Sequence, residues 1–336
     1  MVVEVIDGRT LDEATAAEIA EVSNAADRID APQNEPQPGE YIRLRFRHGW
    51  DDLGTENVVV GRVDGALAAV ASVELPVWDN QHMAFVELVI APDYRGSGIG
   101  ARVLDQVYAV MKTNDRSLLI ANAWKGSDLE RFWLDHGLEM GSEAAQRRLR
   151  PLDLDWPHLD RLHAEALAAS TAYDIVQVTQ PVSDDLVEEM VQLQLTMNDA
   201  PVDGLTVDDD VWDAKRYRAT ESAAANRRMT PHRLVARHRD SGDVAGFTVV
   251  AVEHDRPHLG FQEDTAVIRA HRGHRLGVRL KIEMLRYLRE AEPRIVQIDT
   301  WNAVSNSHMI AVNDAIGCFV VGYGGELQRD FGKTSA

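Results

Sequence analysis

The chain has 336 residues, more than one compact core usually takes, so two domains of about 150 residues each are expected. Apolar residues make up 45% and charged residues 26% of the sequence, as in ordinary globular proteins. The net charge is −19, from 54 acidic and 35 basic residues, and nucleic acid backbones and anionic membranes repel a chain this acidic. Neither is expected as a partner.

The amino-terminal residues, Met1 to Thr10, are acidic and polar where a secretory signal needs a basic start and an apolar run. No stretch approaches the roughly 18 apolar residues of a membrane span. The single cysteine, Cys318, excludes an intramolecular disulfide and is expected to fill core space. These features predict a cytoplasmic protein.

The first half of the chain predicts a helix, a hairpin, a strand, a loop, a helix, a strand and a helix. Thr10 and Glu13 have capping-box spacing at the start of the first helix, and a proline-rich polar loop follows it. Asp64-Gly65 favours the tight turn of a hairpin. The later elements are strands 57–63, 66–74, 85–91 and 118–121, a helix after residue 100 and a short helix over 128–136.

The second half repeats this order. Its predicted elements are a helix over 183–197, strands 233–238, 244–252, 265–268 and 295–300, a helix ending near 290 and a helix from 305 to 317. Equivalent residues are Asp30 and Asp199, Arg95 and Arg272, Asn122 and Asn302, and Gly137 and Gly317, at offsets that rise from 169 to 180. An internal duplication explains this register. It predicts a first domain over 1–150, a linker over 151–171 that includes a helix, and a second domain over 172–336.

The sharpest chemical signal is the segment Arg95-Gly96-Ser97-Gly98-Ile99-Gly100, between a predicted strand and a predicted helix. Three alternate glycines let a ligand approach the backbone, and the following helix directs unpaired N–H groups and its positive end at the loop. A dinucleotide site needs G-x-G-x-x-G and a Walker loop needs Gly-Lys-Ser/Thr, and this segment has neither. It predicts a pyrophosphate site of another class.

The strand, the segment from Pro92 to Gly100 and the helix together resemble the acetyl-CoA pyrophosphate loop of the GNAT superfamily of N-acetyltransferases. The GNAT order of elements occurs twice, so the resemblance covers nearly the whole chain. It is strongest to tandem actinobacterial acetyltransferases of the mycothiol synthase-like type. It implies an α/β fold with two tandem GNAT-type domains. Each would have a mostly antiparallel central sheet, flanking helices and a splayed strand pair at the cofactor site.

The resemblance also implies which residues contact coenzyme A. In the first domain they are Val89, Ile90, Arg95, Gly96, Ser97, Gly98, Ile99 and Gly100. In the second domain they are Arg272, Gly273, Gly277 and Asn306, with Ala266 and Val267 at the equivalent strand positions. Arg275 stands where the family has its middle glycine, so its side chain could crowd the pyrophosphate or add a cation. The first domain has Gly126 in place of Asn306.

The implied reaction is direct attack of a neutral amine on the thioester carbonyl, which needs a base for the amine and an acid for the leaving thiolate. Glu87 is the predicted base of the first domain, because a carboxylate inside an apolar strand is costly to bury unless it is solvated, paired or used. The same spacing before Arg272 selects Asp264 in the second domain. Alternation along a strand places Glu263 on the opposite face.

The family's usual acid is a tyrosine four residues before the glycine that ends the last helix, and these positions hold Trp133 and Asn313. Three explanations stay open. Tyr94 or Tyr323 substitutes, water protonates the thiolate, or one domain is inactive. His271 and His274 flank the second loop without the spacing of a metal site, so no metal is predicted.

The sequence therefore predicts an enzyme that transfers an acetyl group from acetyl-CoA to an amine of a small-molecule acceptor. The alternatives are a non-catalytic or sensing acyl-CoA-binding protein and a protein-lysine acetyltransferase. The first loop keeps the family's middle glycine, which favours the first domain as the one that holds the coenzyme. In mycothiol synthase-like proteins, by contrast, the second domain is the active one. Assembly into a homodimer is left open.

Overall fold

The computed structural model of the chain describes residues 1–332, which form two compact units. Unit 1 consists of residues 1–143, 202–210 and the carboxyl-terminal segment from Gly322, and unit 2 consists of residues 144–201 and 211–321. The predicted boundaries, 1–150, 151–171 and 172–336, treat each half of the chain as continuous, whereas the units exchange segments. Helix α5 (Trp156–Ala169), in the predicted linker, belongs to unit 2, where its Leu159 lies in the core.

Unit 1 contains a mainly antiparallel sheet with the strand order β1-β2-β3-β4-β5-β12. Its strands are β1 (Val2–Ile6), β2 (Asn57–Val63), β3 (Ala66–Glu74), β4 (Met83–Ile90), β5 (Leu118–Trp124) and the end of β12 (Phe319–Asp330). Its helices are α1 (Glu13–Asp30), α2 (Gly39–His48), α3 (Ile99–Thr113) and α4 (Asp128–Asp135). Short 3-10 turns lie at Gly8–Thr10 and Pro92–Tyr94.

Alternation along the strands of unit 1 assigns their side chains to two helical layers. Val58 and Val60 of β2 lie in the core that contains Ile19 of α1 and Phe46 of α2. Val59, between them, lies in the core formed with α3 and α4. Because successive side chains of a strand point to opposite faces, the sheet is covered by helices on both sides.

Unit 2 repeats this arrangement with the strand order β6-β11-β10-β9-β8-β7. Its strands are the end of β6 (Glu139–Leu149), β7 (Tyr173–Val178), β8 (Met229–His238), β9 (Val244–Glu253), β10 (Leu259–Val267) and β11 (Gln297–Ala303). Its helices are α5, α6 (Val187–Leu195), α7 (Ala214–Asn226), α8 (Leu276–Ala291) and α9 (Ser307–Ala315). Short 3-10 turns lie at Pro151–Asp153, Asp184–Leu186, Thr196–Asp199 and Arg269–His271.

The central strand β9 of unit 2 is buried along its whole length. Phe247 and Val249 pack with α6, whereas Val250 and Val252 pack with α8. The second sheet therefore also lies between two helical layers, and the mixed α/β fold predicted from the sequence is confirmed.

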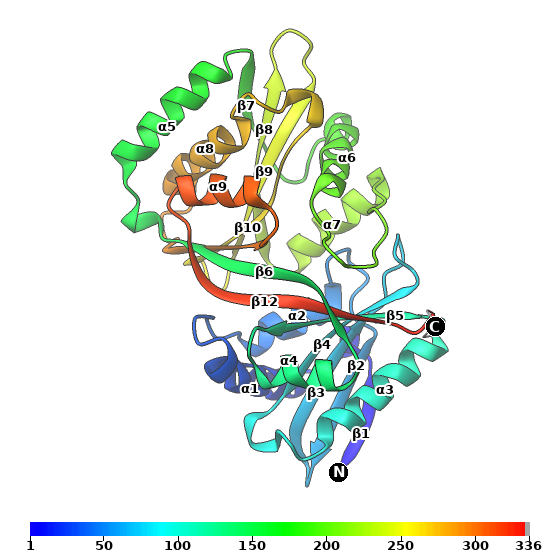
Figure 1. Ribbon diagram of the computed structural model, residues 1–336. Helices are drawn as coiled ribbons and strands as arrows, with labels where there is room; N and C mark the ends of the chain where they lie inside the picture. The colour runs from blue at the N-terminus through cyan, green and yellow to red at the C-terminus, as the bar shows by residue number, and fades with distance from the viewer. Residues whose placement is uncertain (333–336) are drawn as a thin grey trace. The chain divides into compact units, whose positions relative to one another are not determined.

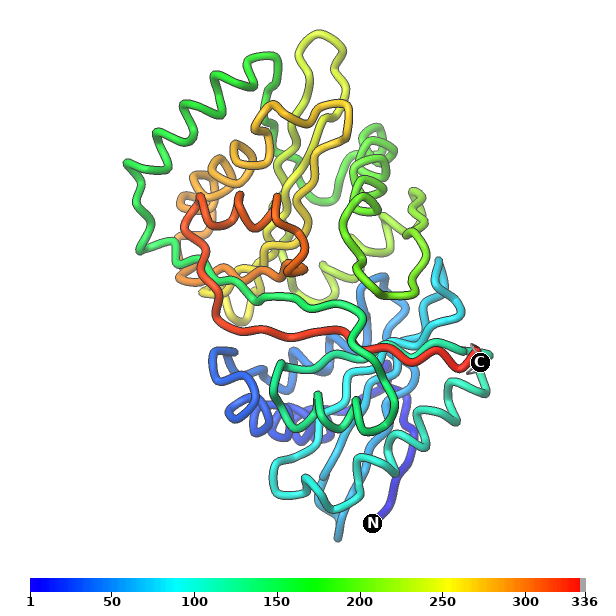
Figure 2. Tube along the Cα trace, in the orientation of Figure 1, coloured from blue at the N-terminus to red at the C-terminus, as the bar shows by residue number. Residues whose placement is uncertain are grey.

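The last strand of each sheet comes from the other half of the sequence. In unit 1, residues 324–330 of β12 pair antiparallel with residues 118–124 of β5 (Figure 1). The carboxyl-terminal part of the chain runs along β5 in the trace as well (Figure 2). In unit 2, residues 144–149 of β6 pair antiparallel with residues 298–303 of β11. Each unit thus needs a strand from the other half to complete its sheet, which is why its boundaries are discontinuous.

The hairpin predicted at Asp64-Gly65 is confirmed, since β2 ends before it, β3 begins after it and both residues have positive φ, 50° and 89°. The predicted start of the first helix at Thr10 is wrong. Helix α1 has Asp12 as its N-cap, and the Asp12 carboxylate accepts a hydrogen bond from the Thr15 N–H at 2.7 Å. Aspartate is as good an N-cap as serine or threonine, so the capping-box spacing alone did not decide the position. Strands β1, β6, β7 and β12 and helices α2 and α7 were not predicted.

Candidate active site

In each unit two parallel strands pair over a few residues and then separate. Residues 83–86 of β4 pair with 118–121 of β5, and residues 259–261 of β10 pair with 297–299 of β11. Within the described residues, neither pair continues towards the carboxyl ends of its strands. The backbone there is open on one edge of each strand, as expected for the splayed strand pair that the resemblance implies.

The two splayed pairs differ in one strand. A register shift between Gln262 and Thr265 marks a bulge in β10, whereas β4 runs along β3 with continuous register from Phe85 to Ile90. An extra residue in one strand bends it and redirects its side chains. Of the two strands that lead into the glycine loops, β10 of unit 2 is therefore bulged and β4 of unit 1 is not.

The glycine-rich segment of unit 1 joins β4 to α3 and exposes its backbone. Gly98 is the N-cap of α3 with φ 85°, and apart from the adjoining residues no atom of the described chain lies within 4 Å of the place that a Cβ would take at Gly96 or Gly98. The first N–H groups of α3 have no intrahelical acceptor. Together the loop and the helix end form a cradle that fits an anion.

The arginine that opens each loop is paired with an acidic residue of its own unit. Arg95 forms ion pairs with Asp30 at the end of α1 and, at 3.3 Å, with Asp128 at the start of α4. Arg272 pairs with Asp199 in unit 2. The register that the duplication predicted thus corresponds to an ion pair that recurs in both units. Because these guanidinium groups are engaged, the backbone supplies most of each loop's capacity to bind an anion.

The second loop keeps the shape of the first with a different side chain. Arg275 is the N-cap of α8 and has φ 55°, the left-handed conformation that Gly98 has in unit 1. Its Nη1 donates to the Glu165 carboxylate of α5 at 2.7 Å, and this contact draws the guanidinium towards α5. The places that a Cβ would take at Gly273 and Gly277 are open within the described chain.

Comparison with known proteins gives the family. The sequence profile described as "Acetyltransferase (GNAT) family" matches residues 24–124 and 195–314, about two thirds of the chain and one stretch in each half. The chain belongs to the GNAT acetyltransferase family. No functionally curated protein is similar enough in sequence to count as a match.

Solved GNAT structures share the fold over nearly the whole chain. A tandem GNAT protein from the clavulanic acid biosynthesis pathway, solved without acetyl-CoA, is 22% identical with a TM-score of 0.77, and the alignment covers 99% of this chain and 100% of that one. A GCN5-related N-acetyltransferase from Sphaerobacter thermophilus is 16% identical with a TM-score of 0.68, covering 98% and 96%. At these identities the likeness establishes the fold, and the predicted tandem of two GNAT domains is confirmed.

Membership of the GNAT family indicates acyltransferase activity, and proteins with this fold generally bind acetyl-CoA. Among residues 1–332, no three histidine, cysteine, aspartate or glutamate side chains are grouped to hold a metal ion. No helix in the same residues is long and apolar enough to cross a membrane.

Glu87, the predicted base of the first GNAT domain, forms an ion pair with Arg45 of α2. It is the first residue of β4 beyond the stretch paired with β5, so it lies where the splayed strands separate. The carboxylate is therefore paired with an arginine. Such pairing explains a carboxylate inside an apolar strand without a catalytic role.

In the second GNAT domain the bulge of β10 carries two neighbouring carboxylates, Glu263 and Asp264. Asp264 accepts a hydrogen bond from Gln194 Nε2 at 3.2 Å. Loss of solvation and the charge of Asp264 raise the pKa of Glu263 to about 7, although the side chain is still accessible to solvent. The bulge interrupts the alternation on which the assignment of Glu263 to the opposite face depends, so that assignment stays a prediction. The spacing before Arg272 selected Asp264 and not Glu263, and the two adjacent acids are the signal that could have pointed to Glu263.

The family's tyrosine is replaced in both domains, and each replacing residue forms a hydrogen bond with the asparagine that recurs in the two halves of the chain. Trp133 Nε1 donates to the Asn122 carbonyl at 3.2 Å, and Asn313 Nδ2 donates to Asn302 Oδ1 at 2.6 Å. The last helix of each domain is thereby fixed to the strand that carries this asparagine. Neither Trp133 nor Asn313 is an acid that can protonate a thiolate.

Other predicted residues have local partners. Asn306 is the N-cap of α9, where its side-chain oxygen accepts a hydrogen bond from the Met309 N–H at 3.1 Å. Val89 and Ile90 pair with β3, and Ala266 and Val267 pair with β9, so in both domains these residues keep one strand neighbour.

The aromatic and histidine candidates lie in different surroundings. Tyr94 packs against both cores of unit 1, whereas Tyr323 is exposed. The ring of His271 lies 3.1 Å from the Tyr173 hydroxyl, and His274 contacts a backbone carbonyl at 3.4 Å. These contacts give both histidines a structural partner beside the second loop.

Proposed function

We propose that the protein is an acetyl-CoA-dependent N-acetyltransferase that acts on an amine of a small molecule. The observation that supports this most directly is the open backbone of Gly96 and Gly98 at the amino end of α3, in a chain of the GNAT family. A pyrophosphate placed there accepts hydrogen bonds from the first-turn N–H groups and interacts favourably with the helix dipole. In this proposal Val89, Ile90 and residues 95–100 hold coenzyme A in the first domain.

We assign the proton transfer to the second domain. Glu263 has a pKa of about 7, and a general base works best when its pKa lies near the working pH. In the proposed step its carboxylate takes a proton from the substrate ammonium, the neutral amine attacks the thioester carbonyl, and coenzyme A leaves as the thiolate. Water then carries to the thiolate the second proton, which the nitrogen releases as the amide forms. Glu87 is the weaker candidate because Arg45 is bound to it.

In this proposal the residues predicted to contact coenzyme A in the second domain hold it in the domain that also carries Glu263. Residues Arg272, Gly273, Gly277 and Asn306 frame the amino ends of α8 and α9. Asp264, predicted as the base, becomes in this proposal the neighbour whose charge adds to the larger effect of lost solvation in raising the pKa of Glu263.

Two measurements on the full chain test the proposal. Calorimetric titration with acetyl-CoA should give saturable heat, and an amine panel followed by release of free thiol should give turnover with at least one small amine. Absence of heat and of thermal protection by acetyl-CoA would contradict the coenzyme assignment. Turnover only with lysine-containing peptides would replace the small-molecule acceptor by a protein.

A non-catalytic acyl-CoA-binding protein is the second candidate, favoured by Trp133 and Asn313 at the positions of the family's tyrosine. It predicts saturable binding of acetyl-CoA with thiol release no faster than hydrolysis in the absence of an amine. The amine panel therefore separates the two candidates with the same sample.

A further inference from the structure

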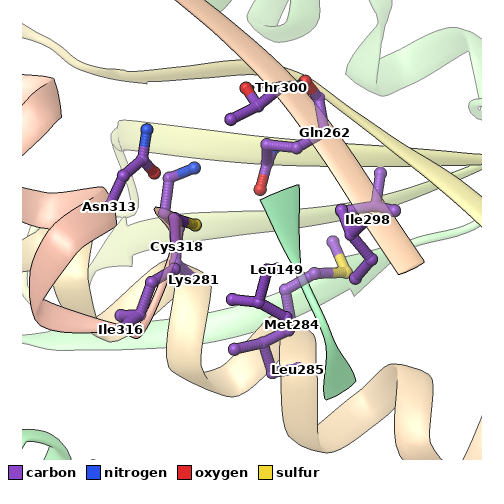
Figure 3. A pocket seen from close by; sticks show the side chains of 11 residues that line it. Leu149, Gln262, Lys281, Met284, Leu285, Ile298, Thr300, Asn313, Ile316 and Cys318 are labelled. Atoms are coloured by element: carbon purple, nitrogen blue, oxygen red, sulfur yellow. Dashed lines mark hydrogen bonds between the residues drawn. The ribbon is translucent and has the colours of Figure 1, made fainter. Parts of the chain in front are cut away.

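Unit 2 contains a cavity of about 20 Å³ at the point where β10 and β11 separate. Gln262 and Thr300, each the first residue beyond the paired stretch of its strand, line the cavity. Lys281 of α8 and Asn313 of α9 line it from the helical layer, together with the Cys318 thiol (Figure 3). A space of this size holds one ordered water or a group of a few atoms.

Two of these polar side chains have unused hydrogen-bonding capacity. Lys281 is 3% exposed, and no side chain or carbonyl of residues 1–332 bonds to its amine. Asn313 is fully buried; its Nδ2 bonds to Asn302, but its Oδ1 has no partner in the described chain. Polar groups that face a cavity inside the protein without partners are costly, because they lose the hydrogen bonds that water would supply.

The first domain has apolar side chains at the equivalent positions. By the register of the two loops Lys281 corresponds to Leu104, and by the register of the last helices Asn313 corresponds to Trp133. Leu104 and Trp133 are buried together in one core of unit 1. The polar pair is therefore not a requirement of the GNAT fold but a property of the second cleft.

We infer that Lys281 is a covalent acetyl acceptor, and that acetyl-CoA bound in the second domain acetylates its amine. The inference rests on the proposed binding of acetyl-CoA between β10 and β11, which brings the thioester end of the pantetheine arm to the cavity. The Lys281 amine points into the space between Asn313 and the pair of Gln262 and Thr300 (Figure 3).

The chemistry balances without a further reactant. The neutral Nζ attacks the thioester carbonyl, an amide C–N bond forms and the C–S bond breaks. Coenzyme A leaves as thiolate and takes the proton that Nζ releases. The product is neutral, so it removes a buried charge, and its amide N–H is a donor that the Asn313 Oδ1 can accept.

The surroundings favour the lysine as the nucleophile of this cavity. Burial lowers the pKa of Lys281 to about 8, so the neutral amine is present near physiological pH. Burial raises the pKa of the neighbouring Cys318 to about 11, so its thiol stays protonated. The other charged groups near Cys318 are paired with each other, Asp299 with Arg148 and Asp314 with Arg147.

The chain has five lysines, so peptide mapping can follow all of them. The full chain is incubated with trideuteroacetyl-CoA at pH 8 and digested, and the label is measured by mass spectrometry. We expect Lys281 to be labelled at least about tenfold faster than the exposed Lys112, Lys125 and Lys215, since exposed lysines are almost entirely protonated at this pH. Its labelling should saturate with acetyl-CoA and level off above about pH 8, whereas that of the exposed lysines should keep rising to about pH 10.

Three variants complete the test. Lys281→Leu, which introduces the residue of the first domain, should lose this label and leave that on the other lysines unchanged. Gly273→Glu, in the second loop, should slow labelling of Lys281 alone. Titration of a Gly98→Glu variant shows separately whether the second domain binds acetyl-CoA. If it binds and Lys281 stays unlabelled, the inference is overturned and the proposed function stands. If it does not bind, that part of the proposed function fails, and the inference fails with it.

Discussion

At the start of α3, unit 1 has Gly98 in a left-handed conformation, and at the start of α8, unit 2 has Arg275 in the same conformation. Where the splayed strands separate, unit 1 has a regular β4 with Glu87 bound to Arg45, and unit 2 has a bulged β10 with an accessible Glu263. The first unit thus has the loop richer in glycine, and the second has the carboxylate that we propose as the base. A duplicated domain can lose one part of a site while its copy keeps it.

The helical layer beneath the splayed strands differs in the same way. Leu104 and Trp133 close the space in unit 1, whereas Lys281 and Asn313 leave a cavity in unit 2. Identical folds therefore hold different chemistry, because function resides in individual side chains placed on a shared scaffold.

The largest effect should come from the base. Glu263→Gln should lower kcat for an active amine by about 10²–10⁴, the usual contribution of a general base. In the native chain the rate should fall as the pH drops below about 7, since Glu263 must be ionised to accept a proton. Glu87→Gln is the matched variant in the first domain. A larger loss for Glu87→Gln would reverse the assignment of chemistry to the second domain.

The next effect concerns the first cradle. Gly98→Glu should weaken binding of acetyl-CoA by unit 1 about 100-fold, because the new side chain and charge enter the space of the pyrophosphate. Gly65→Glu is the control for backbone strain, since Gly65 has φ 89° and equally open surroundings in a hairpin turn. Calorimetry of both variants should show the loss for Gly98→Glu only. Equal losses would mean that strain, and not the ligand site, is responsible.

A smaller effect should distinguish the two repeated ion pairs. Asp30→Asn removes a largely buried partner of Arg95 and should lower the free energy of unfolding by about 1–3 kcal/mol. Asp199→Asn removes the more exposed partner of Arg272 and should change stability less. Urea unfolding of both variants measures the difference. A larger loss of stability for Asp199→Asn than for Asp30→Asn would show that the more exposed ion pair is the one that fixes its loop.

The smallest effect should follow the replacement Arg275→Gly. Because the Arg275 side chain is bound to Glu165, its removal should change the affinity of the second domain for acetyl-CoA by no more than about threefold. The measurement is titration of this variant in the Gly98→Glu background. An affinity that rises tenfold or more would mean that Arg275 crowds the second cradle.

The sequence by itself determined the family, the duplication and the first loop. Local chemistry is enough for these features. Alternate glycines mark a place where backbone must meet a ligand, Asp64-Gly65 fixes a tight turn, and equivalent residues at a drifting offset reveal the repeat. The pairing of Arg95 with Asp30 and of Arg272 with Asp199 explains why these residues were the ones that registered the two halves.

Only the tertiary structure decided which strands complete each sheet and which side chains meet at the splayed strands. The hydrophobic pattern is equally compatible with β6 and β12 pairing within their own halves of the chain. Alternation determines which side chains of a strand face the core, but it does not determine which strand lies beside it. The bulge of β10 against β9, the pairing of Glu87 with Arg45 and the cavity around Lys281 depend on contacts between residues far apart in the chain. Such contacts leave no local pattern in a sequence, since packing and not propensity selects them.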